Sequence, residues 1–355
     1  MKKIIALILA AVMLMGILCA CAPKDKTGGK KTIGILLPTK EQTTWTSQGE
    51  RLTASLSEKG YNTLIEYAED DSARQAMQLE NMISKGADAL VIAAVDHAAL
   101  TDACEKAKAA GIFIVASDRL ITNTKALDYY VTFDLARVGE MQGQYIIDAL
   151  DIENQAGPFT MEIFSGSQDD TNAIEFYNGA MNVLKPYLDS GKLVVKSGQV
   201  EYTQTAIQSW DSSKAQARMD NLLSGFYSDT HLDAVLVAAD CLSIGVISSL
   251  ESMGYGMTGV PYPIVTGQDA ELAAVKNIMT GKQSMTVYLD DDTRVAIIVE
   301  VVEALLKGEA ITPDTTYNNE VFDVPTRTYD PYLIDKDNVQ YLAEVGFYTD
   351  AELNG

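Results

Sequence analysis

From residue 32 onward, short runs of β-branched and other apolar residues alternate with longer amphipathic stretches. The apolar runs lack a strict alternation of apolar and polar positions, which is typical of strands in a parallel sheet covered on both faces. The stretches between them have the length and period of helices. Strands are expected at 32–38, 62–69, 89–94, 113–117, 159–166, 193–198, 234–240 and 263–268, and helices around 47–59, 73–85 and 101–110.

These repeated strand–helix units predict an α/β fold of two doubly wound, mainly parallel-sheet lobes. The chain has 355 residues, and that length suits two domains of roughly 150 residues each. The two series of units are separated near residues 129–140, where we expect the chain to cross from one lobe to the other.

The start of the chain has the pattern of an export signal. A short cationic segment, MKK, precedes the apolar run 4–18, and the sequence LCAC follows at 18–21. This arrangement resembles a bacterial lipobox, which implies that residues 1–20 are a lipoprotein signal peptide and that Cys21 is lipidated. The polar residues 22–31 would then extend a flexible tether from the anchored cysteine. A plain signal peptide or a short membrane anchor is the alternative interpretation.

Composition and charge narrow the possible partners. Hydrophobic residues make up 47% of the chain and charged residues 21%, so that each lobe can bury a core. The formal net charge of -22 argues against binding to nucleic acid or to an anionic membrane surface, because phosphate binding requires a basic footprint.

Polar and aromatic side chains follow the expected strands in both halves of the chain. Ligands of open parallel sheets bind beyond the carboxyl ends of the strands, so these positions are the candidate site. A single Asp there is commonly only a helix N-cap, but its recurrence in both lobes favours a binding rim. The candidate residues are Lys40, Trp45, Asp96, Asp118, Arg119, Asp134, Asn172, Trp210, Asp240, Gln268 and Asp269.

The chemistry of this rim suits a neutral polyol. Carboxylates accept hydroxyl hydrogens, a guanidinium donates in a fork, and Asn and Gln amides do both. The rings of Trp45 and Trp210 could cover the C–H faces of a sugar, although core packing is an equally reasonable role for each.

The sequence gives little support for a catalytic or a metal site. The only histidines are His97 and His231, which leaves no multi-histidine metal site, and no cofactor motif is present in a suitable context. Neighbouring carboxylates such as Asp169 and Asp170 seldom face each other across a sugar, so a glycosidase is disfavoured and no enzymatic activity is expected. Cys104 and Cys241 could form a disulfide in an exported protein, but two free thiols are the favoured state.

The chain as a whole, from about residue 32, resembles the type I periplasmic binding proteins. More narrowly, it is similar to the multiple-monosaccharide and xylose-binding proteins of ABC transporters. The runs that carry the resemblance are 38–40, 118–121, 132–134, 166–173, 184–199, 215–224, 242–250 and 267–271.

The resemblance implies a cleft that closes around one monosaccharide at the candidate residues. It also implies three crossings between the lobes, which we place near residues 134, 289 and 311. The N-terminal lobe would comprise 32–134 plus 290–310, and the C-terminal lobe 135–289 plus 311–355. Thr44, Ser209 and Leu289 depart from the family pattern, in which two arginines and a lysine are common, so fewer cationic donors are expected.

The function implied by the resemblance is capture of a monosaccharide of the xylose, glucose, galactose or arabinose class. A monomeric, extracytoplasmic receptor, anchored through Cys21, would deliver the sugar to an ABC permease and its ATPase. A receptor that passes a sugar signal to a chemotaxis protein or a sensor kinase is the alternative.

Overall fold

A computed structural model describes residues 29–354; the predicted signal peptide and Cys21 lie outside the described residues. A compact unit begins at Thr32 and contains all the elements discussed below. In this part of the chain, no helix combines the length and the apolar character needed to cross a membrane.

The first sheet has seven strands in the order β11-β12-β5-β4-β3-β1-β2, and every pair except β11–β12 is parallel. Its first five strands along the chain are β1 (Thr32–Leu37), β2 (Asn62–Tyr67), β3 (Ala89–Ile92), β4 (Phe113–Ser117) and β5 (Tyr129–Phe133). The helices around it are α2 (Thr43–Glu58), α3 (Ser72–Ser84), α4 (Thr101–Ala109) and α11 (Asp291–Lys307).

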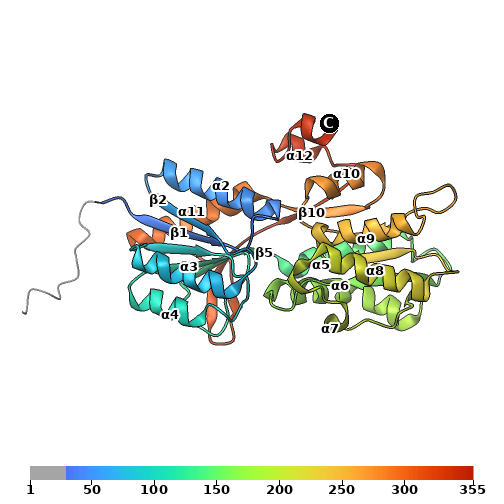
Figure 1. Ribbon diagram of the computed structural model, residues 1–355, viewed down its shortest axis with the longest axis horizontal. Coiled ribbons are helices and arrows are strands. Elements are labelled where there is room, and N and C mark those ends of the chain that lie inside the picture. The colour runs from blue at the N-terminus through green and yellow to red at the C-terminus, as the bar shows by residue number, and fades with distance from the viewer. Residues whose placement is uncertain (1–28, 355) are drawn as a thin grey trace, which may run out of the picture. The chain divides into compact units, whose positions relative to one another are not determined.

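Helices cover this sheet on both sides, with α2 and α11 on one face and α3 and α4 on the other (Figure 1). Successive side chains of a strand point to opposite faces, and β1 shows the consequence. Ile33 and Ile35 pack in the core cluster that includes α2 and α11, whereas Leu36 packs in the cluster that includes α3 and α4. Apolar residues are therefore needed at consecutive positions, which explains the continuous apolar runs of the sequence.

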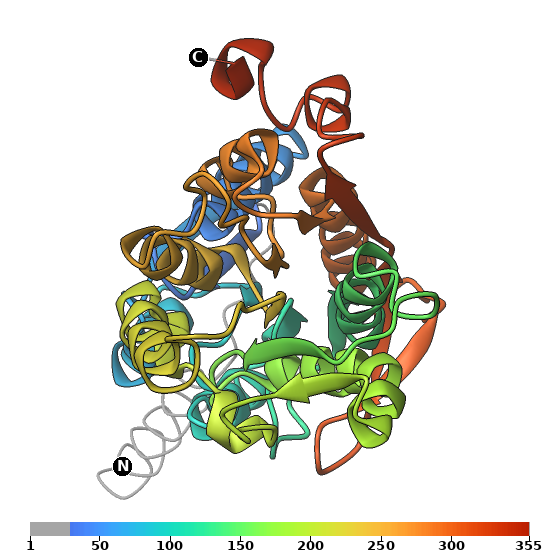
Figure 2. The ribbon, with the colours of Figure 1, turned by 90° about the vertical axis from the view of Figure 1, so that its right-hand side faces the viewer.

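The second sheet has four parallel strands in the order β7-β6-β8-β9. They are β6 (Phe159–Phe164), β7 (Leu193–Val195), β8 (Ala234–Val237) and β9 (Ile264–Val265). The main helices of this lobe are α5 (Leu135–Ala149), α6 (Thr171–Ser190), α8 (Ser212–Phe226) and α9 (Asp240–Ser252), with α5 beside α6 and α8 beside α9 on opposite sides of the sheet (Figure 2). The first pair packs closely because Gly139 lies against the backbone of Phe176, where a Cβ would come within 1.9 Å of the carbonyl oxygen.

A two-stranded antiparallel sheet of β10 (Met285–Leu289) and β13 (Pro331–Asp335) packs near α5. The short helices α10 (Leu272–Thr280), α12 (Tyr341–Glu344) and α13 (Asp350–Asn354) share a core cluster with it through residues such as Tyr288 and Ile334. The remaining elements are α7 (Tyr202–Thr205), the 3-10 helix η1 (Gln208–Trp210), β11 (Thr315–Asn318) and β12 (Asp323–Tyr329).

Three segments connect the lobes, and one of them differs from the sequence-based expectation. The first two are the links from β5 to α5 and from β10 to α11, as expected near residues 134 and 289. The third was expected near residue 311, but β12 pairs with β5 in the first sheet. Residues 315–329 therefore belong to the N-terminal lobe, and the chain crosses from β12 to β13 at Asp330. The predicted C-terminal lobe, which included 311–355, was therefore wrong for residues 315–329, which form the antiparallel hairpin of β11 and β12.

The α/β architecture of two mainly parallel sheets is confirmed, and every expected strand is present, although β9 is shorter than expected. The expected helices are α2, α3 and α4, with bounds shifted by a few residues. The described cysteines Cys104 and Cys241 are both free thiols, as favoured by the sequence.

Candidate functional site

A small pocket, partly open to solvent, lies where the carboxyl ends of strands from both sheets meet. Its enclosed volume is about 30 Å³, which is room for about two water molecules, so that a ligand would need the two lobes to move apart. Candidate residues from the sequence that line it are Trp45, Asp118, Arg119, Asn172, Trp210, Gln268 and Asp269. Gln42, Thr44, Asp170, Phe176, Ala239 and Cys241 complete the lining.

Asp118 forms the floor of the pocket directly after β4. Its φ of 65° lies in the left-handed region, and its amide donates to Val131 O at 2.8 Å, which holds the residue in this unusual conformation. Strained backbone of this kind is concentrated at functional sites. The carboxylate accepts from Arg294 Nη1 at 3.0 Å and from Asn172 Nδ2 at 3.1 Å. Burial raises the pKa of Asp118, and the neighbouring charges of Arg294 and Arg119 oppose that shift.

Arg119 extends the floor towards the second lobe. Its Nε lies 2.9 Å from Asp170 Oδ2, and its Nη1 donates to Ala94 O at 3.2 Å. The guanidinium carbon is 5.1 Å from the centroid of the Trp45 ring, close enough for a cation–π contact. Trp45 is itself positioned by a hydrogen bond from Nε1 to Gln42 Oε1 at 2.9 Å.

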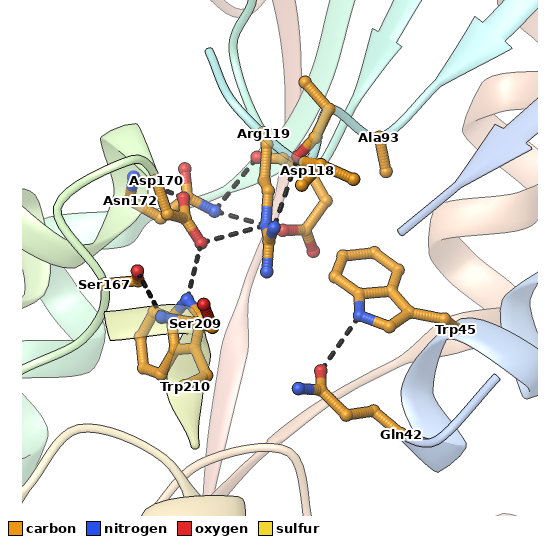
Figure 3. Close-up of polar contacts among 12 residues, drawn as sticks. Gln42, Trp45, Ala93, Asp118, Arg119, Ser167, Asp170, Asn172, Ser209 and Trp210 are labelled. Carbon is orange, nitrogen blue, oxygen red and sulfur yellow. Dashed lines mark hydrogen bonds and ion pairs between the residues drawn. The ribbon is translucent and has the colours of Figure 1, made fainter. Parts of the chain in front are cut away.

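The two indole rings lie on either side of Arg119, one from each lobe (Figure 3). Trp210 Nε1 lies 3.2 Å from Asp170 Oδ2, the same oxygen that pairs with Arg119. The ring also lies against Gly166, where a Cβ would come within 2.0 Å of a ring carbon. Asp170 and Gly166 thus fix Trp210 at the wall of the pocket.

Gln268 and Asp269 follow β9 and form another part of the wall. Asp269 has a φ of 95°, and its amide donates to Val287 O at 2.8 Å. The Gln268 amide donates to Asp269 Oδ1 at 3.3 Å. Burial, followed by the carboxylates of Glu271 and Asp118, raises the pKa of Asp269 to about 7.

The other four predicted residues do not line the pocket, because their side chains are used elsewhere. Asp96 and Asp134 accept from the backbone amides of Ala98 and Arg137, respectively, in the manner of local caps. Lys40 is exposed, with Nζ 5.0 Å from the ring centroid of Tyr67.

Asp240 is fully buried behind the pocket wall. Its carboxylate accepts from Gln283 Nε2 at 2.7 Å, Thr286 Oγ1 at 2.8 Å and the amide of Glu271 at 3.0 Å. Its own amide donates to Gln268 O at 2.9 Å. Asp240 therefore shapes the loop that carries Gln268 and Asp269, instead of facing the pocket.

Two important residues were absent from the sequence-based site. Asp170 follows the same strand as Asn172 and was visible in the polar run after β6, but an Asp there equally predicts a helix cap, and Asp170 does cap α6. Arg294 is fully buried. Its signal was an arginine shortly after the pair Asp291–Asp292 and directly before the apolar run 295–299.

Two residues that line the pocket each have a side-chain amide oxygen without a hydrogen-bond donor among the described residues. Asn172 Oδ1 and Gln268 Oε1 are buried and have no hydrogen-bond partner within the described chain. Such groups are costly to bury unless a ligand or water satisfies them. Burial also raises the pKa of Cys241 well above its ordinary value, so this lining thiol stays protonated and is a poor nucleophile. The arrangement is suited to holding a hydroxylated ligand between aromatic rings.

Comparisons with known proteins agree with this geometry. A family model described as a periplasmic binding protein domain matches residues 33–310. The multiple sugar-binding periplasmic receptor ChvE of Rhizobium radiobacter is 46% identical over 351 residues, covering 98% of this chain and 98% of that protein. The multiple sugar-binding periplasmic protein SbpA of Azospirillum brasilense is 47% identical over 325 residues, or 91% of each protein.

A similar solved structure is an ABC transporter solute-binding protein from Clostridium phytofermentans with bound β-D-glucose. It has a TM-score of 0.87 and 42% sequence identity, and the match covers 91% of this chain and 100% of that one.

Proposed function

Because the chain belongs to the periplasmic binding protein family, we propose that it captures one monosaccharide in the pocket between its lobes and delivers it to an ABC importer. The family consists of binding receptors and not of enzymes. The observation that carries the proposal is the pocket itself. Charged residues of both lobes and two indole rings surround it, and two of the lining residues have a buried amide oxygen without a donor in the part of the chain that the structure describes.

The proposed ligand is a neutral sugar of the xylose, glucose, galactose or arabinose class. Two relatives that match 91% or more of the chain are named as multiple sugar-binding proteins, and the similar structure from Clostridium phytofermentans holds glucose. The indoles of Trp45 and Trp210 would cover the apolar faces of the ring, while Asp118, Asn172 and Asp269 would bind its hydroxyl groups.

Binding would stabilise a closed arrangement of the lobes about the three connecting segments. Direct contacts across the pocket support this mechanism. Asn172 of the second lobe donates to Asp118 of the first at 3.1 Å, and Arg119 pairs with Asp170. The amide of His97 also donates to Asp169 O at 3.2 Å. A sugar that contacts residues of both lobes would further stabilise the closed arrangement.

The proposal includes the place of the protein in the cell. The lipobox-like sequence ending at Cys21 supports an extracytoplasmic receptor anchored to the membrane by lipid. The closed form would dock on a permease whose ATPase supplies the energy, and no chemical change of the sugar is required.

A thermal-shift screen against D-glucose, D-xylose, D-galactose and L-arabinose tests the proposal, because a ligand that binds only the folded state raises the melting temperature. Calorimetric titration of Asp118→Asn with the strongest ligand should show binding weakened by about 2 kcal/mol, as expected for a lost charge-assisted hydrogen bond. The matched control is Asp71→Asn, since Asp71 is an exposed helix cap outside the pocket and outside the connecting segments. If no monosaccharide stabilises the protein, the proposal is wrong.

A further inference from the structure

Among the residues that the structure describes, the pocket has one carboxyl group that is not paired with a cation. Both guanidinium groups near it are already paired, since Arg119 lies against Asp170 and Arg294 bonds to Asp118 and Asp291. Asp269 also lines the pocket, and its polar contact is the neutral amide of Gln268 at 3.3 Å. The pocket therefore contains a carboxyl group whose charge would be available to a ligand.

The surroundings of Asp269 increase this imbalance. Burial and the carboxylates of Glu271 and Asp118 disfavour ionisation of Asp269, and the hydrogen bond from Gln268 and the charge of Arg294 oppose this only in part. A buried anion in such a position is stabilised most effectively by a cation that enters with the ligand.

The unsatisfied amide oxygens lead to the same conclusion from hydrogen bonding alone. Asn172 is 2% exposed and Gln268 is 5% exposed, and each has an amide oxygen without a donor. The orientation of Asn172 is fixed, because its Nδ2 donates at 3.1 Å to both the carbonyl oxygen and the Oδ1 of Asp118, neither of which can donate when the carboxylate is ionised. Its Oδ1 therefore faces away from Asp118 and has no donor in the described chain, so that a donor of a bound ligand would satisfy it.

Building on the proposed monosaccharide-binding function, we propose that the pocket selects sugars rich in N–H and O–H donors, and that it binds amino sugars of the D-glucosamine type with their ammonium group at Asp269. An ammonium group supplies three donors and a positive charge, and it accepts nothing. Sugar acids are excluded, because their carboxylate would face Asp269 and the two amide oxygens without a free cation to receive it.

The size of the preference follows from the strength of a charge-assisted hydrogen bond in a desolvated pocket. D-glucosamine should bind about tenfold more tightly than D-glucose, and D-glucuronate at least about a hundredfold more weakly.

The test is a set of calorimetric titrations of the purified protein with D-glucose, D-glucosamine and D-glucuronate at about pH 7, repeated with Asp269→Asn. In Asp269→Asn, the preference for D-glucosamine over D-glucose should fall to about one, because the amide has the same shape but no charge. The matched control, Asp71→Asn, removes an exposed carboxylate outside the pocket and the connecting segments and should keep the preference. The comparison of the three sugars on the unmodified protein needs no variant.

The outcomes separate this inference from the proposed function. Binding of D-glucose without a preference for D-glucosamine, a preference that survives in Asp269→Asn, or comparable binding of D-glucuronate would each overturn the inference alone. Failure of all three sugars, and of the neutral sugars in the thermal-shift screen, would overturn the proposed function and this inference with it.

Discussion

The carboxylate of Asp118 lies 3.0 Å from the guanidinium of Arg294, a residue 176 positions later in the chain. Arg294 is on α11, which follows the second crossing between the lobes and returns to the first sheet. The return of the chain thus places a buried cation beneath the residue at the centre of the proposed sugar site. Arg294 also bonds to Asp291, so that one guanidinium serves two buried carboxylates.

Replacing Arg294 with Met should destabilise the protein strongly. The variant leaves Asp118 and Asp291 buried without their cation, and breaking a buried pair in this way costs about 3 kcal/mol or more. Urea unfolding measures the change in the free energy of unfolding. Arg51→Met is the matched control, because Arg51 pairs with Asp292 at the exposed surface, where a pair contributes about 0.5 kcal/mol. Equal losses in the two variants would contradict the role assigned to Arg294.

Asp269 should make the stability of the protein depend on pH. Its pKa is raised from 3.8 to about 7, so between these values the carboxyl is protonated in the folded protein and ionised in the unfolded chain. The unfolded state then binds fewer protons, and the free energy of unfolding decreases as the pH rises from about 4 to about 7 and levels off above that.

The measurement for Asp269 is urea unfolding over this pH range for the unmodified protein and for Asp269→Asn. Subtracting the two curves removes the other titrating groups, and the difference should decrease with pH. The nearby charges of Glu271, Asp118 and Arg294 are present in both proteins. A difference that does not change with pH would show that the Asp269 carboxyl titrates normally.

Gly166→Ala should displace Trp210 without unfolding the protein. The added methyl group would lie 2.0 Å from the ring, which cannot stay hydrogen-bonded to Asp170 in its present position. We expect an altered near-ultraviolet circular dichroism signal and sugar binding weakened about tenfold, or about 1.4 kcal/mol. Gly225→Ala is the control, since no atom lies within 4 Å of an added Cβ at that helical position. Unchanged sugar affinity in Gly166→Ala would remove Trp210 from the site.

Most strands of the first lobe could be predicted from the sequence because they are continuous apolar runs. β4, for example, has the bounds expected from the run 113–117. The β11–β12 hairpin was missed because its residues are mostly polar and Pro325 lies within β12, where proline argues against a strand. Its position in the sheet depends on pairing with β5, which is distant in the chain.

The same distinction applies to the residues of the site: some could be predicted from the local sequence, and others depend on partners distant in the chain. Asp118 and Asp269 could be assigned to the pocket because each follows a strand, and the carboxyl ends of parallel strands converge. The same rule also selected Asp134, since a helix cap and a ligand-binding residue have the same local sequence. Asp240 and Arg294 could not be assigned, because their partners are determined by packing between distant segments.

Lipid anchoring is testable separately from sugar binding. Cys21→Ser removes the proposed acylation site, so the protein should appear in the soluble extracytoplasmic fraction when cells are fractionated. Cys19→Ser is the matched control, because it changes a neighbouring cysteine within the predicted signal peptide and leaves Cys21 in place. If Cys21→Ser remains with the membrane, the anchor has another origin.

The central claim is that one monosaccharide binds between the lobes in contact with both. A crystal structure of the protein grown with saturating D-glucose tests it most directly. We expect one sugar between the rings of Trp45 and Trp210, with its hydroxyl oxygens about 3 Å from polar atoms of Asp118, Asn172 and Asp269. A sugar bound elsewhere, or a pocket without sugar under those conditions, would contradict the account.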